Sequence, residues 1–235
     1  MKRTEKRTLA WLLCLVLAAG LLATATVFTA AGDEANKEIT AEACYAQAKD
    51  AVLYIRSYYA SGSLKATGSG FVVGADGLAV TAAHVIDKGA RVTAIIPDGT
   101  ELEAAVVSCD TATDVAVLRL PEGQYPALTL AGPSETPAGG AVLRAMGYPI
   151  KDTLIITEGL LAAPTGTVSG KKRMLVTCDI VNGMSGGPIL DRFGHVVGLA
   201  SGSVRTMDGI HLSVLHGELT AAVDAARGNA KEAAK

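Results

Sequence analysis

A histidine, an aspartate and a serine occur in three short motifs whose residue types could together perform nucleophilic catalysis. His84 ends one predicted strand, Asp114 begins a Val-Ala-Val-Leu strand, and Ser185 lies in a Gly-Met-Ser-Gly-Gly-Pro turn. A serine hydroxyl is a weak nucleophile until a neighbouring imidazole takes its proton, and a carboxylate beyond the imidazole fixes its tautomer and stabilises the imidazolium. The three motifs therefore predict a Ser-His-Asp catalytic triad.

The glycines around the serine predict a second part of the same site. They allow the turn to bring the backbone N–H groups of Gly183 and Ser185 into one concavity. Two such N–H groups can bind the oxyanion of a tetrahedral intermediate. We therefore expect Gly183 and Ser185 to form the oxyanion hole of an acyl-transfer reaction.

Each of these residues alone has a simpler interpretation, because a histidine after a strand is usually structural, an aspartate often caps a strand, and a serine between glycines often belongs to a turn. The chain order His84, Asp114, Ser185, with separations of 30 and 71 residues, favours catalysis. This spacing suits a histidine–aspartate pair on one half of the fold and a nucleophile on the other. No Cys or Glu stands at metal-ligand spacing from the other histidines, so we expect no metal and no cofactor.

Most of the chain is predicted to form short strands separated by turns. A Pro- and Gly-rich connection over 121–140 divides these strands into two sets, and an amphipathic helix follows the last of them. Many short strands at regular spacing are typical of sandwiches and closed barrels. We expect a first β-barrel over 50–127 and a second over 128–235 that includes the C-terminal helix, preceded by a linker and a short helix over 32–49.

Residues 1–31 are predicted to be a signal peptide or membrane anchor. A basic head of four Lys and Arg residues precedes an uncharged stretch from Leu9 to Ala31. This pattern is typical of an export signal whose basic end stays cytoplasmic. Cleavage after Ala25 or Ala31 is possible, and the uncut helix of 23 residues could instead span about 30 Å of hydrocarbon. We expect an extracytoplasmic protein, either secreted or anchored to the outer face of the cytoplasmic membrane.

Charge and cysteine content exclude other classes of function. The net charge of −2 and a pI near 6.1 give no reason to expect a nucleic-acid partner. Three of the four cysteines, Cys44, Cys109 and Cys178, follow the targeting segment, and none has Cys-x-x-Cys spacing. A zinc site or a disulfide scaffold is therefore not expected, although the pairing of these three stays open.

The motifs as a set resemble the trypsin-like serine proteases, and within them the HtrA/Deg branch. The resemblance extends over residues 50–227, through the segments 68–73, 81–85, 110–118 and 183–188. It implies a trypsin-like (chymotrypsin) fold of two six-stranded antiparallel β-barrels with the active site between them. It also implies a serine endopeptidase that hydrolyses exported or misfolded proteins through an acyl-enzyme, with a protein or peptide substrate as its partner.

The same resemblance suggests a specificity pocket with Asp179 at its base and Ala200, Ser201 and Gly202 along its wall. If the Asp179 carboxylate points into the pocket, an Arg or Lys side chain of the substrate would relieve its burial. If the carboxylate instead turns away and accepts hydrogen bonds from the backbone that follows it, small aliphatic residues would be preferred, as is general in the HtrA/Deg branch. We favour the aliphatic preference.

The sequence also departs from the family pattern. Met184 stands where many members have Asn or Asp, so activation through an Asp paired with a freed N-terminus is not expected. We also expect no PDZ domain in this chain, although that domain is common in the HtrA/Deg branch. Two alternative functions remain open: a non-catalytic peptide-binding module on a protease fold, and an esterase that uses the same constellation.

Overall fold

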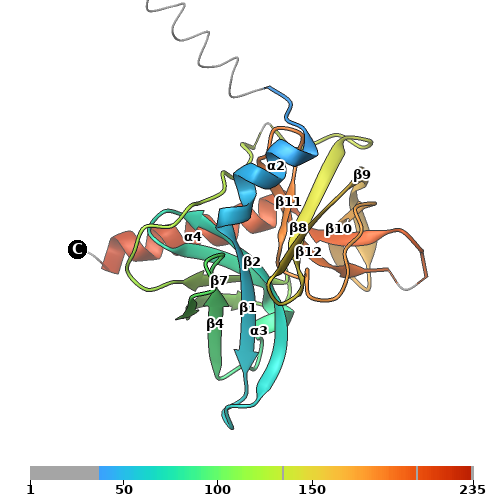
Figure 1. Cartoon of the computed structure of the whole chain (residues 1–235). Helices are drawn as coiled ribbons and strands as arrows, with labels where there is room; N and C mark the ends of the chain where they lie inside the picture. The colour runs from blue at the N-terminus through green and yellow to red at the C-terminus, as the bar shows by residue number, and fades with distance from the viewer. Residues whose placement is uncertain (1–36, 134, 205, 234–235) are drawn as a thin grey trace, which may run out of the picture. The chain divides into compact units, whose positions relative to one another are not determined.

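The computed structural model describes residues 37–133, 135–204 and 206–233 (Figure 1). The predicted signal peptide or anchor over residues 1–31 lies outside the described residues, as does most of the linker that follows it. None of the helices in the described ranges is both long and apolar enough to cross a membrane. The chain from Ile39 onward forms one unit, which is described below by itself.

Seven antiparallel strands form the first sheet, in the spatial order β5-β4-β1-β2-β3-β7-β6. Their bounds are β1 Val52–Tyr58, β2 Leu64–Gly74, β3 Leu78–Ala82, β4 Arg91–Ile95, β5 Glu101–Glu103, β6 Ala105–Asp110 and β7 Val115–Arg119. The β2–β3 hairpin turns at Gly77, whose φ of 86° is one that glycine adopts without strain. Strand β3 is buried along its whole length, so its end is a firm support for the residues that follow it.

The first sheet is not the closed six-stranded barrel that the sequence predicted. Strand β5 pairs only with β4, and β6 pairs only with β7, so the sheet has two edges. The single residue Ala104 joins these edge strands, and its N–H donates to Val92 on β4. The sheet is therefore curled, and its two edge strands follow one another directly in the sequence. No ladder of hydrogen bonds between β5 and β6 closes it into a barrel.

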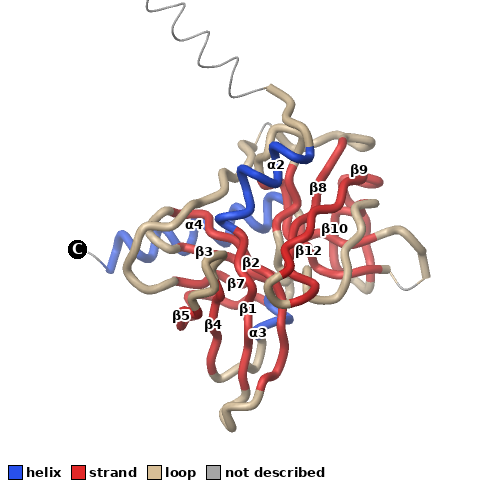
Figure 2. Tube along the Cα trace, in the orientation of Figure 1, coloured by secondary structure: helices blue, strands red, loops and turns tan. Residues whose placement is uncertain are grey.

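Six strands form the second barrel, which is closed in the order β10-β13-β12-β11-β8-β9. Their bounds are β8 Val142–Ile150, β9 Thr153–Val168, β10 Lys171–Val176, β11 Pro188–Leu190, β12 Val196–Ser203 and β13 His211–Val214. This barrel and the mainly antiparallel β architecture confirm the predicted trypsin-like fold class. Figure 2 shows the two groups of strands side by side, with the C-terminal helix running from the second group across the first.

Within the described ranges, the helices that precede the C-terminal one are short. Thr40 caps α2 (Ala41–Ala48), because its hydroxyl accepts a hydrogen bond from the N–H of Ala43 at 3.1 Å. The 3₁₀ turn η1 (Lys49–Ala51) leads into β1, and α3 (Ala83–Ile86) follows β3 directly. The C-terminal helix α4 (His216–Ala233), which confirms the sequence prediction, packs on β7 and β12.

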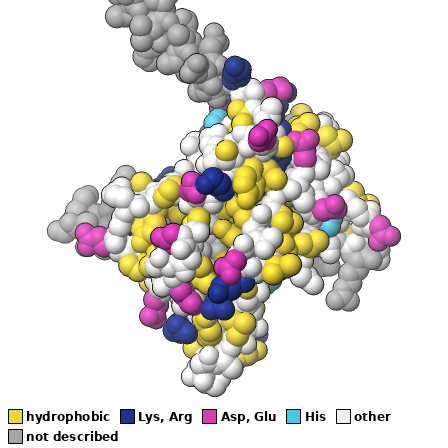
Figure 3. Space-filling model, in the orientation of Figure 1, with side chains coloured by type: hydrophobic (Ala, Val, Ile, Leu, Met, Phe, Trp, Pro, Cys, Tyr) yellow, Lys and Arg dark blue, Asp and Glu magenta, His cyan; other side chains and the backbone are white. Residues whose placement is uncertain are grey.

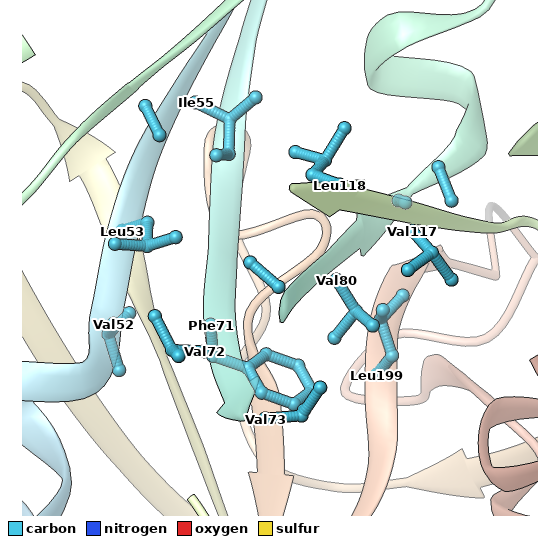
Figure 4. Packing of buried hydrophobic residues seen from close by; sticks show 14 of the residues in the cluster. Val52, Leu53, Ile55, Phe71, Val72, Val73, Val80, Val117, Leu118 and Leu199 are labelled. Atoms are coloured by element: carbon cyan, nitrogen blue, oxygen red, sulfur yellow. The ribbon is translucent and has the colours of Figure 1, made fainter. Parts of the chain in front are cut away.

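One hydrophobic core joins the two groups of strands. Phe71 and Val80 of the first sheet belong to the same buried cluster as Leu199 and Val214 of the second barrel. Figure 4 shows Leu199 beside Val80, at the point where β12 approaches β3. Burying a side chain such as Phe71 stabilises the fold by roughly 1.5–3 kcal/mol. The shared core fixes β12 relative to β3, which are the strands that carry parts of the site described next.

Candidate active site

His84 and Asp114 come together because their strands are neighbours. Strands β3 and β7 pair with Ala82 opposite Val115, so the turn after β3 and the residue before β7 lie side by side. Both carboxylate oxygens of Asp114 lie 3.0 Å from Nδ1 of His84, and Oδ1 also accepts the backbone N–H of His84 at 3.0 Å. The aspartate thus holds both the ring and the backbone of the histidine, which leaves Nε2 of the imidazole as the nitrogen that can act as a base.

The backbone of Asp114 has an uncommon conformation for a non-glycine residue, with a φ of 70°. Its N–H donates to the carbonyl of Asp110 at 2.9 Å, and its own carbonyl accepts from Ala83 at 3.1 Å. A strained backbone of this kind persists only where the surroundings over-determine it. Here the two hydrogen bonds hold the carboxylate under His84.

Burial and hydrogen bonding act in opposite directions on Asp114, whose side chain is only 8% exposed. Burial alone would raise its pKa, but the hydrogen bond and charge interaction with His84, together with a hydrogen bond from Ser201, hold the pKa below its ordinary value. The Ser201 hydroxyl donates to Oδ2 at 2.5 Å. Asp114 is therefore an ionised, fully engaged carboxylate at neutral pH.

The Ser185 turn is packed directly against the end of β3. The carbonyl of Ser185 accepts the N–H of Ser69 at 2.8 Å, and the N–H of Gly186 donates to Ala200 at 2.7 Å. A Cβ at Gly186 would lie 2.2 Å from the backbone carbonyl oxygen of Ser69 and 2.7 Å from the backbone nitrogen of Ala82, so only glycine fits there. The structure therefore brings the turn carrying Ser185, which is half-buried, to the strand end that leads into His84.

Gly183 lies in a tightly defined environment. Its φ is 93°, and a Cβ there would lie 2.7 Å from the carbonyl oxygen of Tyr148. The Ser69 hydroxyl donates to the Gly183 carbonyl and accepts the Tyr148 N–H, both at 2.8 Å. Among the residues that the structure describes, neither the Gly183 N–H nor the Ser185 N–H donates a hydrogen bond to the protein. Both are therefore available to a ligand oxygen.

The four residues predicted for a specificity pocket lie in different environments. The side chain of Asp179 is 77% exposed, with Oδ1 3.6 Å from Nε2 of His211. Ala200 is fully buried, Gly202 has open space where a Cβ would stand, and the hydroxyl of Ser201 is used by Asp114. Their role in substrate selection stays a prediction.

Sequence reasoning missed two residues of this site. The sequence predicts Ser201 as part of a pocket wall and not as a hydrogen-bond donor to Asp114, and it points to Ser69 only as one residue of the segment 68–73. Both side chains make contacts across the junction between the two groups of strands. Their local sequences carry no signal of such long-range partners, although a small polar residue in an otherwise buried strand, as at Ser69, is a reason to look for one.

A cavity of about 320 Å³ lies beside the His84–Asp114 pair. The hairpin between β9 and β10 forms its far side, where the Lys171 ammonium reaches across to the carbonyl of Thr111 at 2.5 Å. Leu212 supplies an apolar surface. The cavity is large enough for side chains of an extended substrate that approaches His84.

Residues 68–199 match the family described as the trypsin-like peptidase domain, which is more than half of the chain. The chain belongs to the trypsin-like peptidase domain family. This finding confirms the resemblance drawn from the motifs, and the matched range contains His84, Asp114 and Ser185.

Curated relatives are DegP- and HtrA-type proteases. The chain is 36% identical over 140 residues to a probable periplasmic serine endoprotease DegP-like of Halomonas elongata, which covers 58% of this chain and 29% of that protein. It is 34% identical over 140 residues to the putative serine protease HhoB of Synechocystis sp., covering 57% of this chain and 33% of that protein. The chain therefore spans about a third or less of the length of these relatives.

A solved structure agrees with the fold. The crystal structure of the serine endoprotease from Yersinia pestis superposes with a TM-score of 0.70 at 25% sequence identity, covering 81% of this chain and 68% of that one. Sequence family, relatives and structure all identify a trypsin-like fold of the HtrA type.

Proposed function

We propose that the chain is a serine endopeptidase that uses Ser185 as nucleophile, His84 as general base and Asp114 as the residue that orients His84. The observation that carries the proposal is the His84–Asp114 pair, held by two 3.0 Å contacts to Nδ1, at the strand end against which the Ser185 turn packs. Membership in a peptidase family supports it.

The proposed reaction follows from which groups can accept protons. With Nδ1–H donated to Asp114, Nε2 of His84 is free to take the Ser185 hydroxyl proton as the serine oxygen attacks the peptide carbonyl. The imidazolium then protonates the leaving amine, and an acyl-enzyme ester on Ser185 remains. Water, deprotonated by His84, attacks this ester, and the proton returns to the serine oxygen as the product acid leaves.

The Gly183 and Ser185 N–H groups are proposed to bind the developing oxyanion. Neither has an acceptor among the described residues, so no protein hydrogen bond must break before they engage the substrate. Removing one donor from such an oxyanion hole costs about 10²–10³ in kcat in other serine proteases. The Ser69 bridge to Gly183 keeps the turn in place between catalytic cycles.

For substrates and location, we propose cleavage of exported or misfolded proteins outside the cytoplasm. Two supports are the predicted targeting segment and the names of relatives described as periplasmic serine endoproteases. The first barrel-like half is proposed to extend over 50–127 and the second over 128–235. Because the Asp179 carboxylate is solvated and lies near His211, it has no need of a cationic substrate side chain, and a small aliphatic preference is proposed.

Digestion of denatured casein tests this proposal. Ser185→Ala and His84→Ala should each lower kcat by on the order of 10⁶, and the double variant should be little worse, since the two residues act as a unit. Ser63→Ala, at an exposed hairpin, should digest casein as the unaltered chain does. Casein cleavage that survives Ser185→Ala would refute the assignment. Hydrolysis of small esters without any casein cleavage would instead favour an esterase. Peptide binding without either activity would favour a non-catalytic peptide-binding module.

A further inference from the structure

A second cavity, of about 330 Å³, contains none of the residues assigned to the active site. It lies where α2 and η1 meet the start of β1, between the β4–β5 turn and the β8–β9 turn. Three tyrosines, Tyr45, Tyr54 and Tyr148, line it together with Ile95 and Leu154. Figure 3 shows hydrophobic side chains gathered over the middle of this face of the molecule, beside isolated acidic and basic side chains.

Two of the tyrosines are almost completely buried and yet have hydroxyl oxygens that are open to the cavity. Tyr54 is 9% exposed and Tyr148 is 8% exposed, and their rings meet edge to face with centroids 6.1 Å apart. Among the described residues, neither hydroxyl oxygen is one of the fully buried polar atoms that lack a hydrogen-bond partner, so both oxygens are open to the cavity that they line. A polar group of a ligand in the cavity can therefore form hydrogen bonds with both oxygens.

Two carboxylates, Asp50 and Asp152, line the same cavity. Burial is the largest cause that raises the pKa of the Tyr148 phenol, followed by Tyr45 and by the charges of Asp152 and Asp50. The phenol is therefore protonated at neutral pH. Each carboxylate has a lysine neighbour in sequence: Lys49 lies 3.0 Å from Asp50, and Lys151 lies 3.8 Å from Asp152. Exposed pairs of this kind are worth only about 0–1 kcal/mol, so the carboxylates remain available to another cation.

We propose that this cavity binds a primary alkylammonium group, presented as the lysine side chain of a polypeptide. Its N–H groups can donate to the two phenol oxygens and to a carboxylate, while its methylene stem lies against tyrosine rings and the apolar side chains. Lys49, which itself lines the cavity, and Lys151 place positive charge beside the two carboxylates. A ligand with one charge on an uncharged chain is therefore preferred over a polyamine, whose second ammonium would meet these lysines.

The proposal can be tested by binding alone, on the full-length Ser185→Ala chain, so that its failure is separate from any failure of the catalytic assignment. Tyrosine ring signals, observed by NMR with ¹³C-labelled tyrosine, are followed during titration with n-butylammonium, n-butanol and the blocked tripeptide acetyl-Gly-Lys-Gly-amide. The signals of Tyr54 and Tyr148, assigned through their Phe variants, should shift with the ammonium and with the lysine peptide. At equal concentration n-butanol should produce no saturable shift.

Variants then define the site. Asp152→Asn should weaken binding of the lysine peptide by about fivefold or more, and Tyr148→Phe by a similar factor. The matched controls Asp208→Asn and Tyr59→Phe change exposed residues outside the cavity and should leave affinity unchanged. Cadaverine should bind more weakly than the lysine peptide. Equal shifts with n-butanol, equal affinities in cavity and control variants, or tighter binding of cadaverine would each overturn the proposal.

Discussion

Replacing Ser201 by alanine tests the electrostatic description of the candidate site. The substitution removes the 2.5 Å hydrogen bond to Oδ2 of Asp114, a carboxylate that is only 8% exposed, while the contacts from His84 remain. A hydrogen bond to a charged group contributes about 1.5–3 kcal/mol. Ser201→Ala should therefore lower the free energy of unfolding by that amount at pH 7, which corresponds to a decrease in Tm of roughly 3–12 °C for a chain of this size.

The stability lost in Ser201→Ala should depend on pH, because the lost hydrogen bond is made to the ionised form of Asp114. Because the pKa of Asp114 in the folded protein lies below its ordinary value, the stabilisation is fully present above about pH 4 and is lost as the pH falls through the folded-state pKa. The difference between the unaltered chain and Ser201→Ala should therefore shrink as the pH falls from 7 to 3. Urea unfolding at several pH values, followed by circular dichroism, measures this difference directly.

Ser213→Ala is the matched control. Ser213 is a buried serine on the neighbouring strand β13, and its hydroxyl donates to the neutral carbonyl of Val214 at 3.0 Å. Its loss should cost about 0.5–1.5 kcal/mol at every pH. The reasoning is refuted if Ser201→Ala costs less than about 0.5 kcal/mol at pH 7, or if its cost is as independent of pH as that of the control.

Three further predictions concern the turn, the triad and the cysteines. Gly186→Ala should lower the free energy of unfolding, measured in urea, by at least about 2 kcal/mol, because it places a Cβ 2.2 Å from the backbone carbonyl oxygen of Ser69 at a φ of 90°. The control Gly217→Ala, whose Cβ would have nothing within 4 Å, should lower it much less. Equal decreases for the two variants would contradict the packing described for Gly186. Asp114→Asn should lower kcat/KM for a peptide substrate by about 10⁴, because His84 would then present the wrong tautomer, and a decrease below tenfold would contradict its role. N-ethylmaleimide should modify the exposed Cys109 in the native protein but not Cys178, because Cys178 is buried and its pKa is raised to about 12. Peptide mass mapping measures the modification of each cysteine. Modification of Cys178 before Cys109 would contradict this prediction.

The fold was largely predictable because its signals are local. Short alternating strands, turns at glycines such as Gly77 and the apolar stripe of the last helix all follow from neighbouring residues. Closure of the first sheet was not predictable. It depends on whether β5 and β6 form a ladder on either side of Ala104, and both are sheet edges whose pairing no local pattern specifies.

The candidate site was predictable in part for the same reason. His84, Asp114 and Ser185 occur in motifs, so their residue types and order could be read directly. Ser201 donates its hydrogen bond to Asp114, which lies 87 residues away in the sequence. Ser69 donates to the carbonyl of Gly183, which lies 114 residues away. These contacts depend on how β12 and β2 lie against the ends of other strands, which is set by the shared core rather than by the local sequence.

The central claim, that Ser185 is a nucleophile activated by His84, is tested most directly by covalent labelling with a fluorophosphonate. The serine oxygen must attack phosphorus and displace fluoride, which requires the same activation as attack on a peptide carbonyl. The folded chain should incorporate one label, located at Ser185 by mass spectrometry, and His84→Ala should lose labelling while retaining its fold. Labelling at another serine, or unchanged labelling of Ser185 in His84→Ala, would contradict the account.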